Sequence, residues 1–148
     1  MNLKDIVRKD CIKILEKNDK KSVLLELINI LSESRAVDDV ETLTERVLYR
    51  EELMSTGIGL GIAIPHVRYE GVKRPTVAVG ISKEGIADYK SIDDKIIKIV
   101  VMILVGKDQH KEHIKLLSEI VSKLKNNNGI DRLLQLETTE EIYSFFIK

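Results

Sequence analysis

Several residue types that often carry function are scarce in this sequence. It has two prolines, which leaves no proline-rich linker, and a single cysteine, Cys11. One cysteine cannot form a disulfide within the chain, and it therefore favours a reducing compartment. Cys11 lies in the apolar alternation CIKIL, which is more typical of a partly buried, unreactive thiol than of a catalytic nucleophile.

Net charge is also missing, because 24 basic side chains balance 24 acidic ones. Proteins that bind polyanions usually carry a basic excess or a basic stripe. The composition therefore argues against a nucleic-acid partner, although it leaves room for a small basic pocket.

A secretion signal and a long apolar run are absent too. The first ten residues, MNLKDIVRKD, carry charges where a signal peptide has its apolar segment. The longest apolar run, Ile96–Val105, contains Lys98 and is too short to span a bilayer. We therefore predict a cytoplasmic protein with no direct membrane insertion.

What the sequence does contain suits one domain over residues 1–148. Its 43% hydrophobic and 32% charged residues are ordinary for a soluble globular protein of a length that buries a real core. No internal repeat or low-complexity tract divides it.

Apolar spacing predicts helices in the first and last thirds of the chain. A short turn at 2–9 precedes one helix that starts at Asp19 or Ser22 and another that starts near Asp38, where Glu41 completes a capping-box pattern. The apolar sides of these two helices are Val23, Leu24, Leu27, Ile28 and Leu31, and Val40, Leu43, Val47 and Leu48. A long helix capped by Asp108 follows later, with the stripe Ile114, Leu117, Val121 and Leu124; it ends at 126–129, and shorter helices follow at 130–136 and 139–147.

Strands are predicted at Cys11–Leu15 on an edge, at Ser55–Ala63, at 75–82 and, as a central strand covered on both faces, at 96–105. In Ser55–Ala63 three glycines alternate with apolar residues, and glycine in a strand often marks a bulge or a close approach. The order of elements predicts an α/β fold, a mixed β-sheet flanked by helices.

Three histidines could carry chemistry. Pro65 ends the glycine-rich strand, so His66 is expected at the rim of the sheet, although spacing alone also fits an idle loop histidine. His113 falls early in the long helix, where a neutral imidazole could donate a hydrogen bond to an anion; a histidine flanking the core is the alternative. His110 is interpreted as solvent-exposed.

Two further site types fit the sequence poorly. The spacing of His110 and His113 could suggest zinc, but no acidic or Cys/His cluster of familiar spacing supports a metal. The glycines of GIGLGIA do not follow a nucleotide-binding order.

The segment REELMSTGIGLGIAIPH (50–66) resembles the signature of the type-2 enzyme IIA domain of the bacterial phosphotransferase system. This is the mannitol/fructose class, which includes nitrogen-regulatory IIA proteins. HIKLL (113–117) resembles the second histidine motif of the family, and the resemblance covers essentially the full chain. Val67 and the segment 105–113 depart from the family pattern without removing a reacting group.

The resemblance implies that His66 is the phosphorylated histidine, that Arg50 faces the phosphoryl group and that His113 is the second active-site histidine. Glu51 and Thr56 match family positions with supporting roles. From the residues alone, Arg50 and Glu51 could equally be a solvated helix end. If the glycine-rich segment folds back, the planar fork of Arg50 suits phosphoryl oxygens.

The implied function is that of a phosphocarrier, a phosphotransferase component that needs no cofactor or metal. His66 would accept a phosphoryl group from HPr and pass it to a cysteine of an enzyme IIB partner for sugar uptake. We expect the glycines to let backbone amides approach this group. A nitrogen-regulatory role, in which phosphorylation controls binding to target proteins, is the alternative. A degenerate domain or a zinc hydrolase is a third interpretation.

Overall fold

The computed structural model describes residues 3–148, so residue 2 of the turn predicted at 2–9 lies outside that range. The elements in chain order are α1 (Leu3–Ile6), β1 (Val7–Ile14), α2 (Lys20–Glu33), α3 (Val40–Leu53), β2 (Gly57–Gly59), β3 (Ile62–Ala63), β4 (His66–Arg68), β5 (Thr76–Ile86), β6 (Ile97–Val105), α4 (His110–Lys125), the 3-10 turn η1 (Asn126–Asn128), α5 (Gly129–Leu134) and α6 (Thr139–Ile147).

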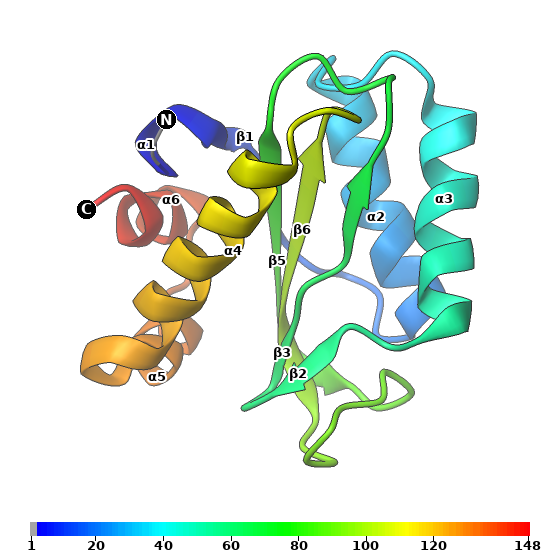
Figure 1. The fold of residues 1–148 in the computed structure, drawn as a ribbon. Coiled ribbons are helices and arrows are strands. Elements are labelled where there is room, and N and C mark those ends of the chain that lie inside the picture. Colours follow the sequence, from blue (N-terminus) through cyan, green and yellow to red (C-terminus); the bar gives the residue numbers. More distant parts are fainter. Residues whose placement is uncertain (1–2) are drawn as a thin grey trace.

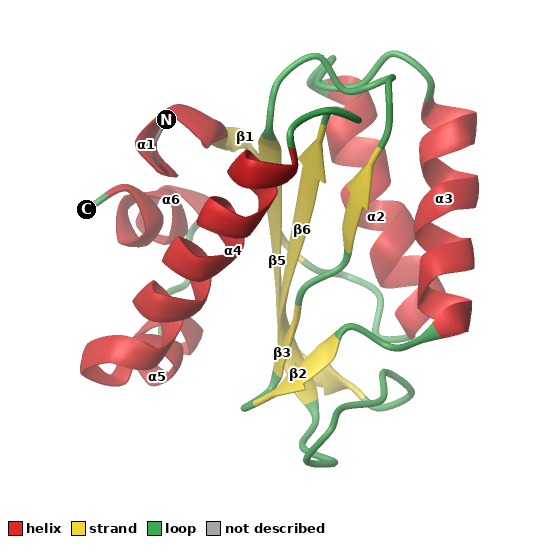
Figure 2. Ribbon diagram, viewed as in Figure 1, coloured by secondary structure: helices red, strands yellow, loops and turns green. Residues whose placement is uncertain are grey.

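The strands form one mixed sheet in the order β1-β5-β6-β3-β2, and β4 also pairs with β6. β5 is antiparallel to β6, whereas β3 and β4 are parallel to it. Helices α2 and α3 cover one face of the sheet, and α1, α4, α5 and α6 lie on the other (Figures 1 and 2). The predicted mixed sheet flanked by helices is therefore confirmed.

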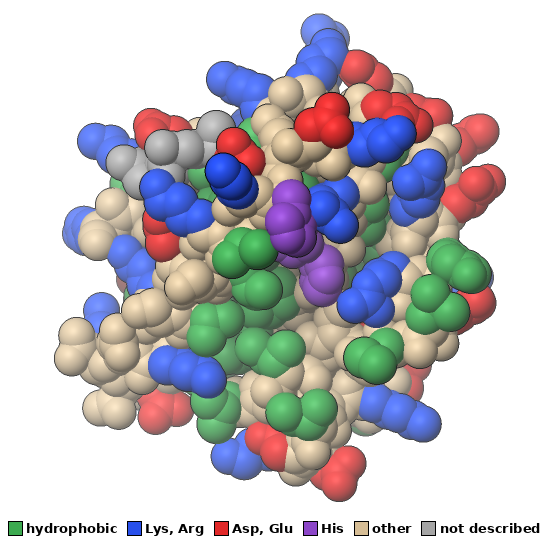
Figure 3. Space-filling model, viewed as in Figure 1, with side chains coloured by type: hydrophobic (Ala, Val, Ile, Leu, Met, Phe, Trp, Pro, Cys, Tyr) green, Lys and Arg blue, Asp and Glu red, His purple; other side chains and the backbone are tan. Residues whose placement is uncertain are grey.

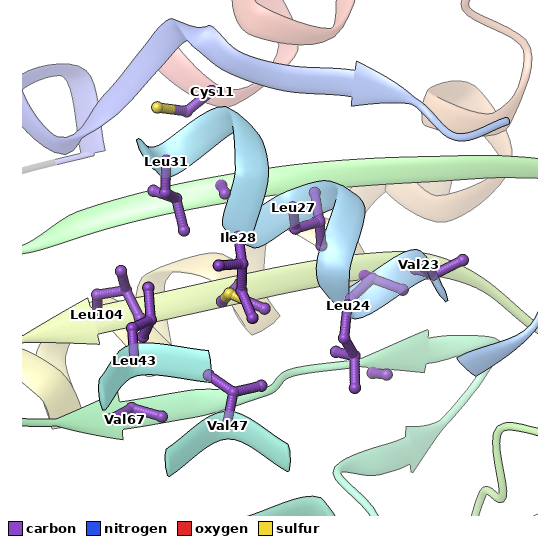
Figure 4. Close-up of a cluster of buried hydrophobic side chains, with 14 of the residues drawn as sticks. Cys11, Val23, Leu24, Leu27, Ile28, Leu31, Leu43, Val47, Val67 and Leu104 are labelled. Carbon is purple, nitrogen blue, oxygen red and sulfur yellow. The ribbon is translucent and has the colours of Figure 1, made fainter. Parts of the chain in front are cut away.

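Each face of the sheet has its own apolar core. β6 is apolar nearly throughout because both of its faces are covered. Its side chains alternate, so that Met102 packs toward α2 and α3 while Ile103 packs toward the α4 side. Figure 4 shows the first core, where apolar side chains of α2 meet Leu43 and Val47 of α3. Cys11 lies in the same core, and burial is the main cause that raises the pKa of its thiol.

The helix starts are partly as predicted. Asp19 caps α2 by accepting a hydrogen bond from the Ser22 amide, but the cap of α3 is Asp39, one residue after the predicted Asp38. Asp39 accepts from both the amide and the hydroxyl of Thr42, whereas Asp38 pairs with Lys73 at the surface. A capping box is present instead at the start of α6, the helix predicted at 139–147.

The long helix α4 is rotated relative to the predicted stripe. Its buried residues are Leu116, Ile120 and Leu124, while Ile114 is 55% exposed. The cap is Gln109 and not Asp108, because the Gln109 carbonyl accepts the first intrahelical hydrogen bond, from the amide of residue 113. No helix within residues 3–148 combines the length and apolar character needed to cross a bilayer.

The largest correction concerns the glycine-rich segment, which forms a hairpin of β2 and β3 and not one strand. Leu60 and Gly61 have φ values of 59° and 79°, which is the pattern of a two-residue type I′ turn. Gly57 packs so closely against the Lys90 carbonyl that a Cβ would overlap it. The edge position of β1 is confirmed, although β1 starts at Val7, and β5 extends beyond the predicted 75–82 to Ile86.

Candidate functional site

His66 is the first residue of β4, opposite Ile103 of β6. β3 and β4 pair with the same edge of β6, and the interruption between them includes Pro65, which has no amide hydrogen to donate. The Pro65 carbonyl nevertheless accepts a hydrogen bond of 2.9 Å from the Ile103 amide. His66 therefore lies within the sheet ladder, not after the end of a strand as predicted.

The backbone around His66 selects one tautomer of its ring. Nδ1 lies 2.9 Å from the carbonyl oxygen of Ile64, and a carbonyl oxygen can only accept a hydrogen bond. Nδ1 therefore carries the hydrogen, and in the neutral ring the lone pair is on Nε2. The half-buried ring of His66 packs edge-to-face on that of His113, with centroids 4.7 Å apart.

His113 lies in the first turn of α4, as predicted. Burial lowers its pKa to about 4, with further contributions from the charges of His66, Arg68 and His110. The ring is therefore neutral at pH 7 and can donate one hydrogen bond. Its Nδ1 is buried and has no hydrogen-bond partner within residues 3–148.

These two rings line an open cavity of about 490 Å³, which we call the histidine cavity. Its basic lining residues are Arg46, Arg50, His66, Arg68, His110 and His113. No carboxylate is among the described residues that line it, so the cavity favours an anion. Figure 3 shows the histidine side chains grouped at the centre of one face, with Lys or Arg side chains beside them and hydrophobic side chains below.

The structure places Arg50 in the lining of this cavity, where the resemblance had implied a guanidinium facing the phosphoryl group. Arg50 lies in the last turn of α3, and its Nη1 donates to the Met54 carbonyl at 3.4 Å. That single contact leaves most of the guanidinium donors free.

Glu51 and Thr56 do not line the histidine cavity. Glu51 is 7% exposed; one of its carboxylate oxygens accepts from the hydroxyls of Tyr89 and Thr56, and the other from Lys20 and the Thr56 amide. We call these four residues the Glu51 network. Burial and the Glu51 charge raise the pKa of Tyr89, so that its hydroxyl remains a donor. The network joins the end of α3 to the start of the glycine hairpin.

Sequence reasoning missed Arg68 and assigned His110 only to solvent. Arg68 donates a 2.8 Å hydrogen bond from Nη1 to Nδ1 of His110, and both residues, although exposed, line the histidine cavity. The available signal was the spacing, because residues two apart on a strand share a face. Arg68 is two positions after His66 and points the same way.

The expectation that the glycines approach a bound phosphoryl group is wrong. None of them lines the histidine cavity; Gly57 packs on Lys90, and Gly59 lies near Asp93.

A metal site and a second cavity are the alternatives to the histidine cavity within the described residues. Within residues 3–148 no group of three or more His, Cys, Asp or Glu is arranged to hold a metal. A larger cavity, of about 760 Å³, lies among the ends of α4, α5 and α6, but no histidine or cysteine lines it. The chemistry of the side chains therefore favours the smaller, histidine-lined cavity.

Comparisons with known proteins identify the family of the chain. The family described as "Phosphoenolpyruvate-dependent sugar phosphotransferase system, EIIA 2" matches residues 5–148. The PTS system fructose-specific EIIABC component of Bacillus subtilis is 33% identical over 143 residues, which make up 96% of this chain and only 22% of that relative. The PTS system fructose-specific EIIA component of Haloferax volcanii is 33% identical over 123 residues, 83% of this chain and 79% of the relative.

A solved structure shows the same relationship. The crystal structure of the nitrogen regulatory protein IIA-Ntr from Neisseria meningitidis matches with a TM-score of 0.87 at 28% identity, over 97% of this chain and 98% of that one. Sequence and fold agree: the chain belongs to the EIIA 2 family of the phosphoenolpyruvate-dependent sugar phosphotransferase system.

Proposed function

We propose that this protein is a phosphocarrier in which Nε2 of His66 accepts a phosphoryl group from the phosphohistidine of HPr and passes it to a cysteine of an enzyme IIB partner. The observation that carries the proposal is the hydrogen bond from Nδ1 of His66 to the Ile64 carbonyl, which leaves a lone pair on Nε2. Family membership supports a phosphotransfer role in general terms.

The transfer needs no proton movement at His66. The Nε2 lone pair forms a new N–P bond while the N–P bond of the donor breaks, and that electron pair returns to the donor imidazole. His66 keeps its Nδ1 hydrogen and becomes an imidazolium, whose charge the Ile64 carbonyl stabilises. In the next step a cysteine thiolate attacks phosphorus, and the N–P electron pair returns to Nε2.

The remaining groups stabilise charge on the phosphoryl oxygens. Phosphoryl transfer depends mainly on positioning and electrostatics. Arg50 supplies a fixed positive charge and free donors, and neutral His113 supplies one hydrogen bond without repelling the His66 imidazolium. Glu51 and Thr56 support the site indirectly, by fixing the backbone that joins α3 to the hairpin.

The first test is the intact mass after incubation with phosphoenolpyruvate, enzyme I and HPr. We expect wild type to gain one acid-labile phosphoryl group, about 80 Da. His66→Gln, which retains His110 and His113, should gain none. An unmodified wild type beside an active HPr, or a His66→Gln variant that is still labelled, would overturn the proposal.

The acceptor is tested separately, with purified enzyme IIB proteins as candidate phosphoryl acceptors. We expect rapid loss of the phosphoryl group to a IIB with its cysteine intact and retention when that cysteine is replaced by serine. Retention with every intact IIB, despite normal charging by HPr, would overturn the IIB step and favour the nitrogen-regulatory alternative.

A further inference from the structure

Arg68 is a cation in the histidine cavity that the proposed relay has not yet used. It lies two residues after His66 on β4, and its side chain emerges on the same face. Successive residues of a strand rise about 3.3 Å each, so the two Cα atoms are about 7 Å apart. An extended arginine side chain spans a comparable distance, which brings its guanidinium within reach of a group bonded to the His66 ring.

His110 fixes the position of Arg68 without cancelling its charge. Arginine always donates, so Nδ1 of His110 accepts the 2.8 Å hydrogen bond with its lone pair, and the His110 ring in this contact is neutral. A carboxylate in the same place would neutralise the guanidinium.

Arg68 has no anionic partner of its own. No carboxylate within residues 3–148 forms an ion pair with it, and none of the described residues that line the histidine cavity is acidic. By contrast, the guanidinium of Arg46 in the same cavity lies over the ring of Tyr69. Arg68 is therefore a positioned, uncompensated cation beside His66.

We propose that Arg68, held in place by His110, is a second guanidinium ligand of the phosphoryl group on His66, in addition to Arg50. The inference rests on the proposed function. Arg68 acts on the phosphoryl oxygens through the donors that His110 leaves free. His110 is a positioning residue that acts through Arg68.

The test uses phosphoramidate, a small donor that removes any effect of partner docking. Nε2 of His66 forms the N–P bond while the P–N bond of phosphoramidate breaks and ammonia leaves. Labelling of His66→Gln measures the phosphoryl group taken up by the other two histidines, and this background is subtracted. We expect Arg68→Gln to lower the rate at His66 about tenfold, because a hydrogen bond to a charged group is lost, and Arg68→Lys to lower it less.

Variants of His110 test whether this residue positions Arg68, because they leave the charge of Arg68 in place. His110→Ala should slow labelling about threefold, because it releases the guanidinium. His110→Asn should restore most of the rate, because its Oδ1 can accept in place of Nδ1. Lys111→Gln is the matched control, since it removes an exposed cation from the same end of α4 without lining the cavity.

The outcomes distinguish the two proposals. If Arg68→Gln and Lys111→Gln are labelled at the same rate, the role of Arg68 is overturned while the phosphocarrier function stands. If His110→Asn is no faster than His110→Ala, the positioning role of His110 is overturned. If wild type is labelled at His66 by neither HPr nor phosphoramidate, the proposed function fails, and the inference fails with it. Thermal unfolding checks that each variant is folded.

Discussion

Arg50 and Glu51 are neighbours on α3, yet they belong to regions with opposite chemistry. In the Glu51 network each carboxylate oxygen accepts from two donors, and the network is closed. In the histidine cavity, cations and a neutral imidazole face solvent without any acidic residue among the described lining. Polar groups that satisfy one another stabilise a fold, whereas polar groups left unsatisfied on a surface are available to a ligand.

The largest effect on stability is expected for Glu51→Ala. Removing this carboxylate leaves the Tyr89 hydroxyl, the Thr56 amide and the Lys20 ammonium without their acceptor, at a cost of about 3 kcal/mol in the free energy of unfolding. Urea titration measures the loss. Glu52→Ala, at an exposed neighbour, should change stability by less than about 0.5 kcal/mol. Equal losses in the two variants would show that the network is not a stabilising element.

Arg50→Gln should give the opposite result. It removes a guanidinium from the histidine cavity, and we expect phosphoryl transfer from HPr to slow about 10- to 100-fold with little change in stability. Quenched-flow mass measurements give the rate, and Lys21→Gln on the exposed side of α2 is the control for lost charge. If Arg50→Gln unfolds more easily but accepts the phosphoryl group at the normal rate, Arg50 is a stabilising residue and not part of the transfer site.

A smaller effect is expected from pH. The pKa of His113 is about 4 in the folded protein against an ordinary value of 6.5, so between these values the unfolded chain binds more protons at this residue. Its contribution to stability is complete above pH 6.5 and is lost as the pH falls toward 4. The stability difference between wild type and His113→Gln should therefore become less favourable to wild type between pH 7 and pH 4.5. A difference that is constant with pH would contradict this assignment.

The smallest effect concerns the glycine hairpin. Leu60 adopts a φ of 59° in a type I′ turn, a conformation that disfavours leucine and favours asparagine before glycine. Leu60→Asn keeps the backbone amide that donates to Asp93 and should stabilise the protein by up to about 1 kcal/mol. Leu60→Val, with a β-branched residue at the same φ, should destabilise it. Thermal unfolding measures the stability of both variants. If Leu60→Val were more stable than Leu60→Asn, the turn assignment would be wrong.

Local patterns were sufficient for the elements whose surroundings are simple. Helical spacing located α2, α3 and α6, and an unbroken apolar run located β6, because burial on one side or on both leaves a periodic trace. The glycine hairpin was misread because Leu60-Gly61 is not a typical turn pair, so the alternation appeared to continue.

The candidate site was only partly predictable for a related reason. The resemblance of residues 50–66 identified Arg50 and His66, but the contact between Arg68 and His110 joins residues 42 positions apart. The partnership of Glu51 with Tyr89, 38 positions away, is equally invisible to local patterns. Such contacts depend on the order of strands in the sheet, which one sequence does not specify.

The attachment of β4 to β6 has a consequence for the proposed phosphorylation of His66. The backbone at His66 is fixed by the sheet, through the pairing with Ile103 and the Pro65 carbonyl, so a phosphoryl group can alter little of its course. The phosphorylated and unphosphorylated forms would then present partners with surfaces of nearly the same shape but opposite local electrostatic potential. Partners would then distinguish the two forms by electrostatic attraction, and their association would depend on ionic strength. The backbone in a crystal structure of either form should closely match that of the other.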